Sequence, residues 1–304
     1  MKETLGVRIK KDWKRNWVLY LMLVPVMLYF VLFWYKPMYG ALIAFQDYRP
    51  AKGFGAEWVG FKHFIRFFQS PFFGRVMKNT IMISLLVLVA GFPGSIFLAL
   101  MINEVKSNKF KGVTQACMHL PYFISLVVVC GLVRKFCLSD GLFNDIIVFF
   151  GGERSPLLQR PELYKLIYVL TDVWQTMGWN SLIFVAALSG IDTQLYDAAK
   201  VDGAGKWQQI KNVTLPGIMP TIIVMLIMQI GNIMSLGYEK TLLLYNESIY
   251  ETSDIIASYV YRVGMMNKEW SYSAAVGIFN SVVNIILVVL ANQFSKKFSE
   301  NSLW

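Results

Sequence analysis

Six runs of apolar residues, each long enough to cross a lipid bilayer as a helix, dominate the sequence. One crossing takes about 20 such residues. The predicted spans are 17–35, 79–102, 113–133, 164–189, 217–236 and 273–294. We therefore predict an all-α integral membrane protein in which residues 17–297 form a single membrane domain with six transmembrane helices.

The six runs differ in how strongly they predict a span. The first carries no charge from Trp17 to Tyr35, whereas the fourth is the weakest because it holds Lys165 and Asp172. Over the whole chain 56% of residues are hydrophobic and 16% are charged. Soluble domains are closer to half apolar and a quarter charged, so this composition also favours a membrane protein.

Basic residues near the N-terminus predict the orientation. An even number of spans places both termini on one side, and segment 1–16 holds six Lys or Arg. They are Lys2, Arg8, Lys10, Lys11, Lys14 and Arg15, and the loop 103–112 adds Lys106, Lys109 and Lys111. Outer loops also carry basic residues, namely Arg49, Lys52, Lys62 and Arg66. The orientation is therefore predicted from the density of positive charge beside the first helix and not from the total number of basic residues on each side. We expect segment 1–16 and the tail 298–304 to be cytosolic, in a bacterial cytoplasmic membrane.

The net charge of +10 does not predict binding to nucleic acid. The basic residues are scattered over helix ends and loops, where anionic lipid head groups would attract them. No soluble module carries a basic patch. We expect membrane lipids, and no nucleic acid, among the partners.

The cysteines and histidines do not form the pattern of a metal site or a catalytic site. Cys117, Cys130 and Cys137 lie in or beside the third span without paired spacing, and His63 and His119 are far apart in sequence. We interpret the cysteines as small apolar side chains. We expect no bond chemistry, no metal and no cofactor on this chain.

One outer loop contains an amphipathic segment. Phe61, Phe64, Ile65 and Phe68 follow i, i+3, i+4, i+7 spacing, with Lys62, Arg66 and Gln69 on the opposite face. This pattern is typical of a helix in the membrane interface. Packing on the outer surface of the domain itself is an equal alternative, and docking of a partner is a third.

A polar island of about twenty residues (Tyr196–Pro216) separates the fourth and fifth spans. Asp192 or Thr193 can cap a short helix at its N-terminus. Gly203 permits a positive φ and thus a sharp turn after Asp202. A second helix is expected at about 205–213. Residues 190–216 are therefore predicted to form a compact helix–turn–helix loop that can fit a groove on another protein.

This loop resembles the cytosolic coupling loop of permease subunits in ATP-binding-cassette (ABC) importers, whose pattern runs E-A-A-x-x-D-G-A and then L-P. The matching residues are Asp197, Ala198, Ala199, Asp202, Gly203, Ala204, Leu215 and Pro216. The usual Glu is replaced by Asp197, which keeps the charge on a shorter side chain. The resemblance implies that the loop docks into a cleft of a separate ATPase subunit.

The same stretch contains a partial phosphate-binding motif, Gly203-Ala204-Gly205-Lys206. A complete motif needs glycine at 200 and Ser or Thr at 207, where this chain has Lys200 and Trp207. We therefore expect ATP and magnesium to bind a partner ATPase and not this chain.

The resemblance covers nearly all of residues 15–297. Within this family the chain is similar to the carbohydrate branch, particularly to permeases for larger oligosaccharides. The segments that carry it are 37–45, 58–61, 79–80, 120–125, 174–180 and 254–262. The resemblance implies a second, homologous permease, two ABC ATPase subunits, an extracellular solute-binding protein and a carbohydrate substrate. Transport would proceed by alternating access, with this chain forming half of the pathway.

A sugar pathway needs hydrogen-bonding groups and aromatic faces within the membrane. The candidates are Asp172, Trp174, Gln175, Trp179, Asn180, Gln229, Asn232, Asn280 and Asn284. Polar groups at this depth are costly unless they are paired or face water. Asp172 has three alternatives: reaching the outer interface, pairing with Lys165, or lining a cavity. For each Asn and Gln the alternative is a hydrogen bond that joins neighbouring helices.

Two other functions remain possible from the residues alone. One is an ABC importer permease for another solute class, such as peptides or phosphate esters. The other is an ion-coupled secondary transporter, which would place charged ion sites near the midplane. Asp172 is the one residue that supports the second alternative, and that alternative gives the loop 190–216 no role.

Overall fold

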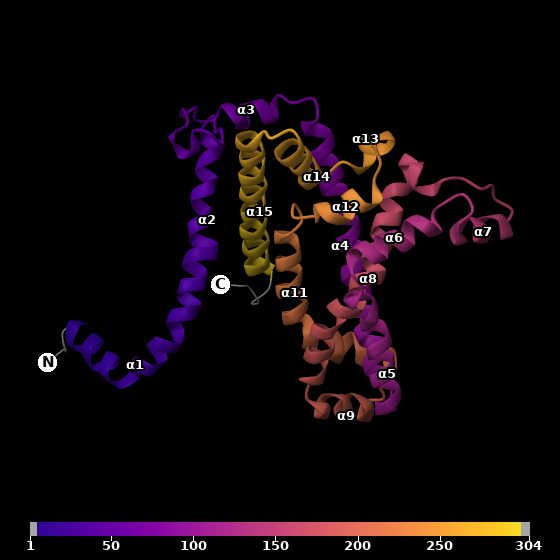
Figure 1. Cartoon of the computed structure of the whole chain (residues 1–304). Helices are drawn as coiled ribbons and strands as arrows, with labels where there is room; N and C mark the ends of the chain where they lie inside the picture. Colours follow the sequence, from indigo (N-terminus) through magenta and orange to yellow (C-terminus); the bar gives the residue numbers. More distant parts are fainter. Residues whose placement is uncertain (1–4, 299–304) are drawn as a thin grey trace.

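The computed structural model describes residues 5–298, and within this range it contains helices and no β-strand. Residues 1–4, with Lys2, and the tail from residue 299 lie outside the described residues. The predicted all-α fold is confirmed. Figure 1 shows the long helices running between two ends of the molecule, here called the α3 end and the α9 end after the short helices that lie there.

The first apolar stretch stands beside the rest of the bundle (Figure 1). It consists of α1 (Leu5–Phe30), a π-helical turn η1 (Val31–Tyr35), α2 (Lys36–Met38) and a 3₁₀ segment η2 (Tyr39–Phe45). No residue of its most apolar window is buried. Its contact with the bundle is made by η2 against the last helix, α15 (Trp270–Phe298), at the α3 end.

Two long helices form the centre of the bundle. α4 (Phe73–Glu104) packs along α8 (Pro161–Ser189). Near the α9 end, Ala99, Phe184 and Leu188 form a buried cluster with Ile218 of α11 (Leu215–Gly231). At 29 residues, α8 is about 43 Å long, which is enough to cross a membrane.

Hydropathy and length identify four candidate spans among the described residues. They are Lys11–Phe45, Phe73–Glu104, Lys206–Gly231 and Trp270–Lys297. α8 is not one of them because polar residues interrupt it, and a helix at the centre of a bundle needs less apolar surface toward lipid. The predicted total of six spans therefore remains a prediction.

The third predicted span, 113–133, is not one straight helix. It divides into α5 (Asn108–His119), a 3₁₀ turn η4 (Leu120–Phe123) and α6 (Leu126–Phe136), with a bend of 90° between the two parts. Pro121 cannot donate a helical hydrogen bond, and Ile124 has extended backbone angles. The apolar composition predicted the helices but not the break between them.

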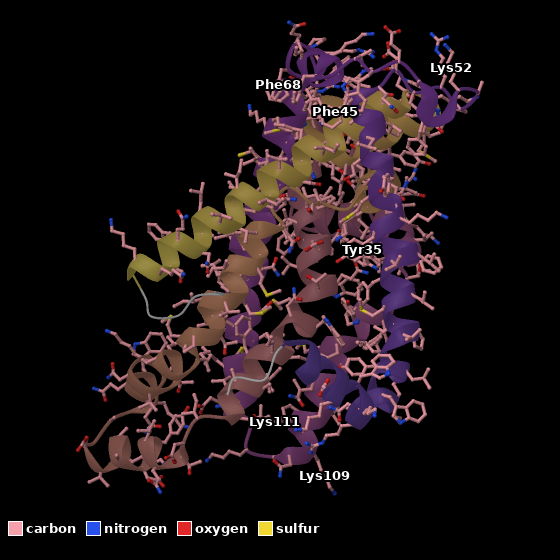
Figure 2. All side chains as sticks on the ribbon, turned by 90° about the vertical axis from the view of Figure 1, so that its left-hand side faces the viewer. Tyr35, Phe45, Lys52, Phe68, Lys109 and Lys111 are labelled. Carbon is pink, nitrogen blue, oxygen red and sulfur yellow. The ribbon has the colours of Figure 1, made fainter. Side chains whose placement is uncertain are left out.

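The remaining elements are short and lie mostly toward the α3 end. They are η3 (Gly53–Gly55), α3 (Lys62–Phe68), α7 (Leu142–Phe149), η5 (Leu157–Gln159), α12 (Tyr238–Leu244), η7 (Glu247–Ile249), α13 (Tyr250–Ser253), α14 (Ile256–Tyr261) and η8 (Arg262–Met266). The loop near the α9 end contains α9 (Thr193–Val201), α10 (Lys206–Gln209) and the π-helical turn η6 (Ile210–Thr214). In Figure 2, Lys109 and Lys111 lie at the opposite end from Lys52 and Phe68.

The amphipathic helix α3 packs on the bundle mainly through a residue that lies outside the predicted apolar face. Phe67 is buried against Tyr259 and Tyr272, while Phe61, Ile65 and Phe68 are 66%, 54% and 51% exposed. The predicted apolar face thus stays partly open, although Phe64 contacts Phe45 of η2 and Phe68 contacts Phe279 of α15. The periodicity gave the helix correctly, but Phe67, one position outside the pattern, is its anchor.

The cysteines do not form a disulfide or a metal cluster within the described residues. Cys130 and Cys137 are buried, whereas Cys117 is exposed. Burial raises the pKa of the Cys137 thiol to about 11, so this thiol stays protonated and unreactive at neutral pH.

Candidate functional site

A polar face runs along the middle of α8 and lines a cavity of about 740 Å³. Asp172, Gln175, Thr176, Trp179 and Asn180 contribute to it. Their spacing of i, i+3, i+4, i+7 and i+8 places them on one side of the helix. Five polar or aromatic side chains therefore share one space inside an otherwise apolar bundle.

The other walls of the cavity come from elements far apart in sequence. α4 contributes the small residues Ser84, Gly91 and Ser95 and the apolar residues Val87, Leu88 and Phe92. α11 contributes Gln229, and Asn232 follows directly at its end. The cavity has the size of a small-molecule binding site, with a few polar groups set in an apolar lining.

Two aromatic rings stack face to face in the lining of this cavity. Tyr122 and Trp179 stack with centroids 4.5 Å apart and an interplanar angle of 3°. Gly178 permits this arrangement, because a Cβ there would lie 1.9 Å from the carbonyl oxygen of Met118. The close approach of α5 to α8 thus carries Tyr122 onto Trp179.

Asp172 forms an ion pair with Lys240 of α12 and lines the cavity at the same time. Of the three alternatives for Asp172, the structure supports the cavity and replaces Lys165 with a different partner. Lys240 is only 6% exposed. Sequence analysis did not find Lys240, although a single lysine beside the apolar run Leu242–Leu244 was a visible signal.

Not all of the predicted pathway residues meet in the cavity. Six of them line it: Asp172, Gln175, Trp179, Asn180, Gln229 and Asn232. Trp174 is 51% exposed and lies outside the lining. Asn280 and Asn284 also lie outside it.

The two asparagines of α15 hold the chain that follows α11. Asn280 donates to the carbonyl oxygen of Met234 at 3.0 Å, and Asn284 accepts from the Met234 N–H at 3.1 Å. Asn284 also donates to the Ser235 hydroxyl at 2.7 Å. These contacts support the alternative in which the two side chains join neighbouring segments. The fifth helix therefore ends at Gly231 and not at 236 as predicted.

The loop at the α9 end begins as predicted. Asp192 accepts a hydrogen bond from the N–H of Gln194 at 2.9 Å and caps α9. At the other end Gly203 has φ +77°, and the N–H groups of Gly203 and Ala204 bond to the carbonyls of Lys200 and Ala199. This pair of bonds is a Schellman motif, which ends a helix and reverses its direction.

The second half of the loop differs from the prediction of a separate short helix. α10, η6 and α11 join into one continuous helical stretch, Lys206–Gly231. The π-helical turn ends at Thr214, two residues before Pro216, and the N–H of Leu215 bonds to the carbonyl of Ile210. A wider turn accommodates a proline, which has no N–H to give and crowds the preceding turn.

The tip of the loop exposes large apolar side chains. Leu195, Val201 and Trp207 are 53%, 89% and 74% exposed. Most of the predicted coupling residues are also exposed, while three are half-buried. The exposed ones are Asp197, Ala198, Asp202, Gly203 and Pro216, and the half-buried ones are Ala199, Ala204 and Leu215.

An ion pair joins this loop to the bundle, and hydrogen bonds within the loop hold its two halves together. Lys206 pairs with Glu104 at the end of α4 at 2.6 Å, and Tyr196 shares a hydrogen bond with Thr214 at 3.1 Å. Gln209 is buried and donates to the carbonyl of Ala204 at 2.9 Å. The loop is thus a defined body with an uncovered surface.

Comparisons with known proteins agree on one family. Residues 91–300 match the family model described as binding-protein-dependent transport system inner membrane component. The chain is 45% identical to the polygalacturonan/rhamnogalacturonan transport system permease protein YteP of Bacillus subtilis (strain 168), over 94% of this chain and 90% of that one.

Solved structures give the same result. A bacterial ABC transporter involved in the import of the acidic polysaccharide alginate contains a chain that is 43% identical, with a TM-score of 0.88, covering 95% of this chain and 99% of that one. The bacterial alginate ABC transporter in complex with its alginate pentasaccharide-bound periplasmic protein contains one that is 41% identical, with a TM-score of 0.89, covering 97% and 100%.

Proposed function

Because this chain belongs to the family of binding-protein-dependent transport system inner membrane components and is a sugar ABC importer permease, we propose that it forms half of an oligosaccharide pathway. The cavity beside α8 would hold sugar. The loop at the α9 end would receive the force of ATP binding from a partner ATPase.

One observation carries this proposal: both helices that leave the loop line the cavity. α8 ends at Ser189, just before the Asp192 cap, and contributes Asp172 to Asn180. The stretch Lys206–Gly231 begins in the loop and contributes Met225 and Gln229. A displacement of the loop would therefore move two cavity walls directly. The coupling is a bias between two arrangements of the bundle, which needs different contacts in each.

The exposed surfaces support particular partners. The apolar tip formed by Leu195, Val201 and Trp207 would enter a cleft of an ABC ATPase, with ATP and magnesium held there. A second, homologous permease would complete the pathway, and a second ATPase would serve it. An extracellular solute-binding protein would deliver the sugar, as the complex of the alginate transporter with its periplasmic protein suggests.

The arrangement also supports the predicted orientation. Lys109 and Lys111 lie toward the end that carries α9 (Figure 2), and the first helix begins toward that end (Figure 1). Basic residues concentrate on the cytosolic side of membrane proteins. We propose six crossings between 17 and 297, the loop 190–216 on the cytosolic side, and both termini there.

The relatives narrow the substrate class. YteP is named for polygalacturonan and rhamnogalacturonan, and the structural relative imports an acidic polysaccharide. We propose that this chain carries fragments of an acidic polysaccharide. The stacked rings of Tyr122 and Trp179 would contact sugar faces, and the amides of Gln175, Asn180 and Gln229 would bond hydroxyl groups.

Affinity purification from native membranes, followed by mass spectrometry, tests the assembly. We expect a second permease and an ABC ATPase to co-purify with this chain. The purified complex in liposomes should hydrolyse ATP faster when its binding protein and an oligosaccharide are added. Recovery of the chain alone, active in ion-driven uptake, would contradict the proposal and favour a secondary transporter. Stimulation by peptides or phosphate esters instead of sugars would change the substrate class only.

A further inference from the structure

Among the described residues that line the cavity, Lys240 is the one with a cationic side chain. It lies on α12, which follows the non-helical stretch after α11 and meets α8 across the cavity wall. Its ammonium group contacts two groups of α8: the carboxylate of Asp172, and the ring of Tyr168 at 5.3 Å. A single buried positive charge therefore sits beside the space that sugar would occupy.

The protein around Lys240 holds it firmly in position. Thr241 and Leu244 of the same short helix are buried, and Arg134 of α6 donates to the carbonyl of Leu243 at 3.4 Å. Burying an ion pair is costly, and replacement by apolar residues of similar size is often neutral or stabilising. Stability alone is therefore a weak reason for this pair, and its place in the cavity indicates a ligand.

Asp172 and Lys240 differ in how exposed their side chains are to the cavity. Asp172 has a side chain that is 21% exposed and faces the cavity, whereas the side chain of Lys240 is 7% exposed. The flexible four-carbon stem of a lysine lets its ammonium turn between neighbouring acceptors. This mobility allows an incoming carboxylate to replace Asp172 as the partner of Lys240, with Asp172 then facing the cavity without that ion pair.

On the basis of the proposed function, we infer that Lys240 binds the carboxylate of a uronate residue in the substrate, and that Asp172 occupies Lys240 until the substrate arrives. The exchange replaces one carboxylate with another, so the buried ammonium keeps a counter-charge throughout. It distinguishes an acidic sugar from its neutral counterpart, which brings no group able to displace Asp172.

The other charged residues of the lining limit the preference for an acidic sugar ring to the position beside Lys240. Asp172 and Glu239 also line the cavity, so two carboxylates accompany one ammonium. An anionic ring is therefore favoured at Lys240 and disfavoured elsewhere. Trp179 lies seven residues after Asp172, about 10.5 Å along α8, where an outer face of its stack with Tyr122 can receive a further ring of the same sugar chain.

A pair of substrates that differ in charge alone tests the inference. The complex in liposomes, with its binding protein, is assayed for stimulated ATP hydrolysis by an oligogalacturonate and by the same oligomer with its carboxylates reduced to primary alcohols. Lys240→Met should reduce the preference for the acidic oligomer, measured as the ratio of kcat/KM values, by about 10- to 100-fold. This is the size expected for one charge-assisted hydrogen bond.

Two further variants control for structural damage. Lys240→Arg keeps the charge and should keep most of the preference. Lys165→Met removes a lysine of α8 that does not line the cavity and should leave the ratio unchanged. Asp172→Asn removes the resident carboxylate and should lower the KM for the acidic oligomer several-fold; an unchanged or higher KM would contradict the exchange.

The outcomes separate the inference from the proposed function. A wild-type complex that responds to both oligomers equally, or a Lys240→Met variant that loses both responses in proportion, would show that the pair is structural. A wild-type complex that responds to no oligosaccharide would overturn the proposed function itself.

Discussion

The two ends of the bundle are built in opposite ways. At the α3 end, Asp254 is completely buried and contacts Arg262 at 2.6 Å, Arg75 at 3.4 Å and Ser258 at 2.8 Å. At the α9 end, the loop 190–216 is capped and turned by local hydrogen bonds and exposes most of its side chains.

The contacts at the α3 end also span long stretches of sequence. Asn79 of α4 donates to the carbonyl of Glu251 at 2.8 Å, and Thr80 accepts from the N–H of Ile256 at 2.9 Å. Each bond joins residues more than 170 positions apart. The α3 end therefore carries its own structural support within this chain, whereas the surface at the α9 end is suited to a partner.

Breaking the buried network should have the largest effect on stability. Asp254→Ala leaves Arg262 and Arg75 without their shared carboxylate in a largely buried site. The loss is expected to be about 3–5 kcal/mol, which should strongly lower both the yield and the melting temperature of the folded protein. The measurement is thermal stability in detergent by size-exclusion chromatography. Asp145→Ala removes an exposed pair with Arg154 and should cost at most about 1 kcal/mol. Equal stability of the two variants would contradict a rigid α3 end.

At the α9 end the largest effect should fall on transport. Gly203 has φ +77°, and a Cβ there would meet no neighbouring atom. Gly203→Val is therefore strained by its backbone alone, by roughly 1–2 kcal/mol, and should alter the turn without unfolding the bundle. We expect uptake to fall at least about tenfold, which corresponds to some 1.4 kcal/mol of lost coupling.

The matched control lies two residues away. Gly205 has φ −68°, so Gly205→Val needs no left-handed backbone and should retain most of the uptake. Normal uptake by a well-expressed Gly203→Val variant would refute the role proposed for this turn.

Substitutions of two asparagines, one that holds the segment after α11 and one in the cavity, should have smaller effects. They distinguish a residue that stabilises the fold from one that binds substrate. Asn284→Ala leaves the Met234 N–H without its acceptor and should cost about 1–3 kcal/mol of stability. Asn180→Ala, in the cavity, should change stability by less than this and raise the KM for the oligosaccharide. Thermal melting and substrate-stimulated ATP hydrolysis are measured for both variants. The reverse pattern would place the pathway beside α15.

The smallest effect is expected for the exposed pair of α9. Lys200 contacts Asp197 at 2.8 Å, with side chains 61% and 70% exposed. Lys200→Ala should change stability by at most about 0.5 kcal/mol, because water and salt screen such a pair. A larger loss in the isolated chain would show that α9 depends on this pair more than its exposure indicates.

Local chemistry explains what could be predicted from the sequence. The apolar runs specify helices, because each needs only its own residues to satisfy its backbone in lipid. The Asp192 cap and the Gly203 turn are likewise local, since each depends on neighbours within a few positions. The polar face of α8 follows from its own helical spacing.

Contacts between distant residues decided the rest. The partner of Asp172 lies 68 positions away on α12, and no spacing rule connects the two. Asn280 and Asn284 have the same residue types and spacing as pathway residues would, yet they face the segment after α11. The apolar runs and turns of the sequence determined the helices and the loop. Only tertiary packing decided which polar side chains share a cavity, because that choice depends on which helices meet.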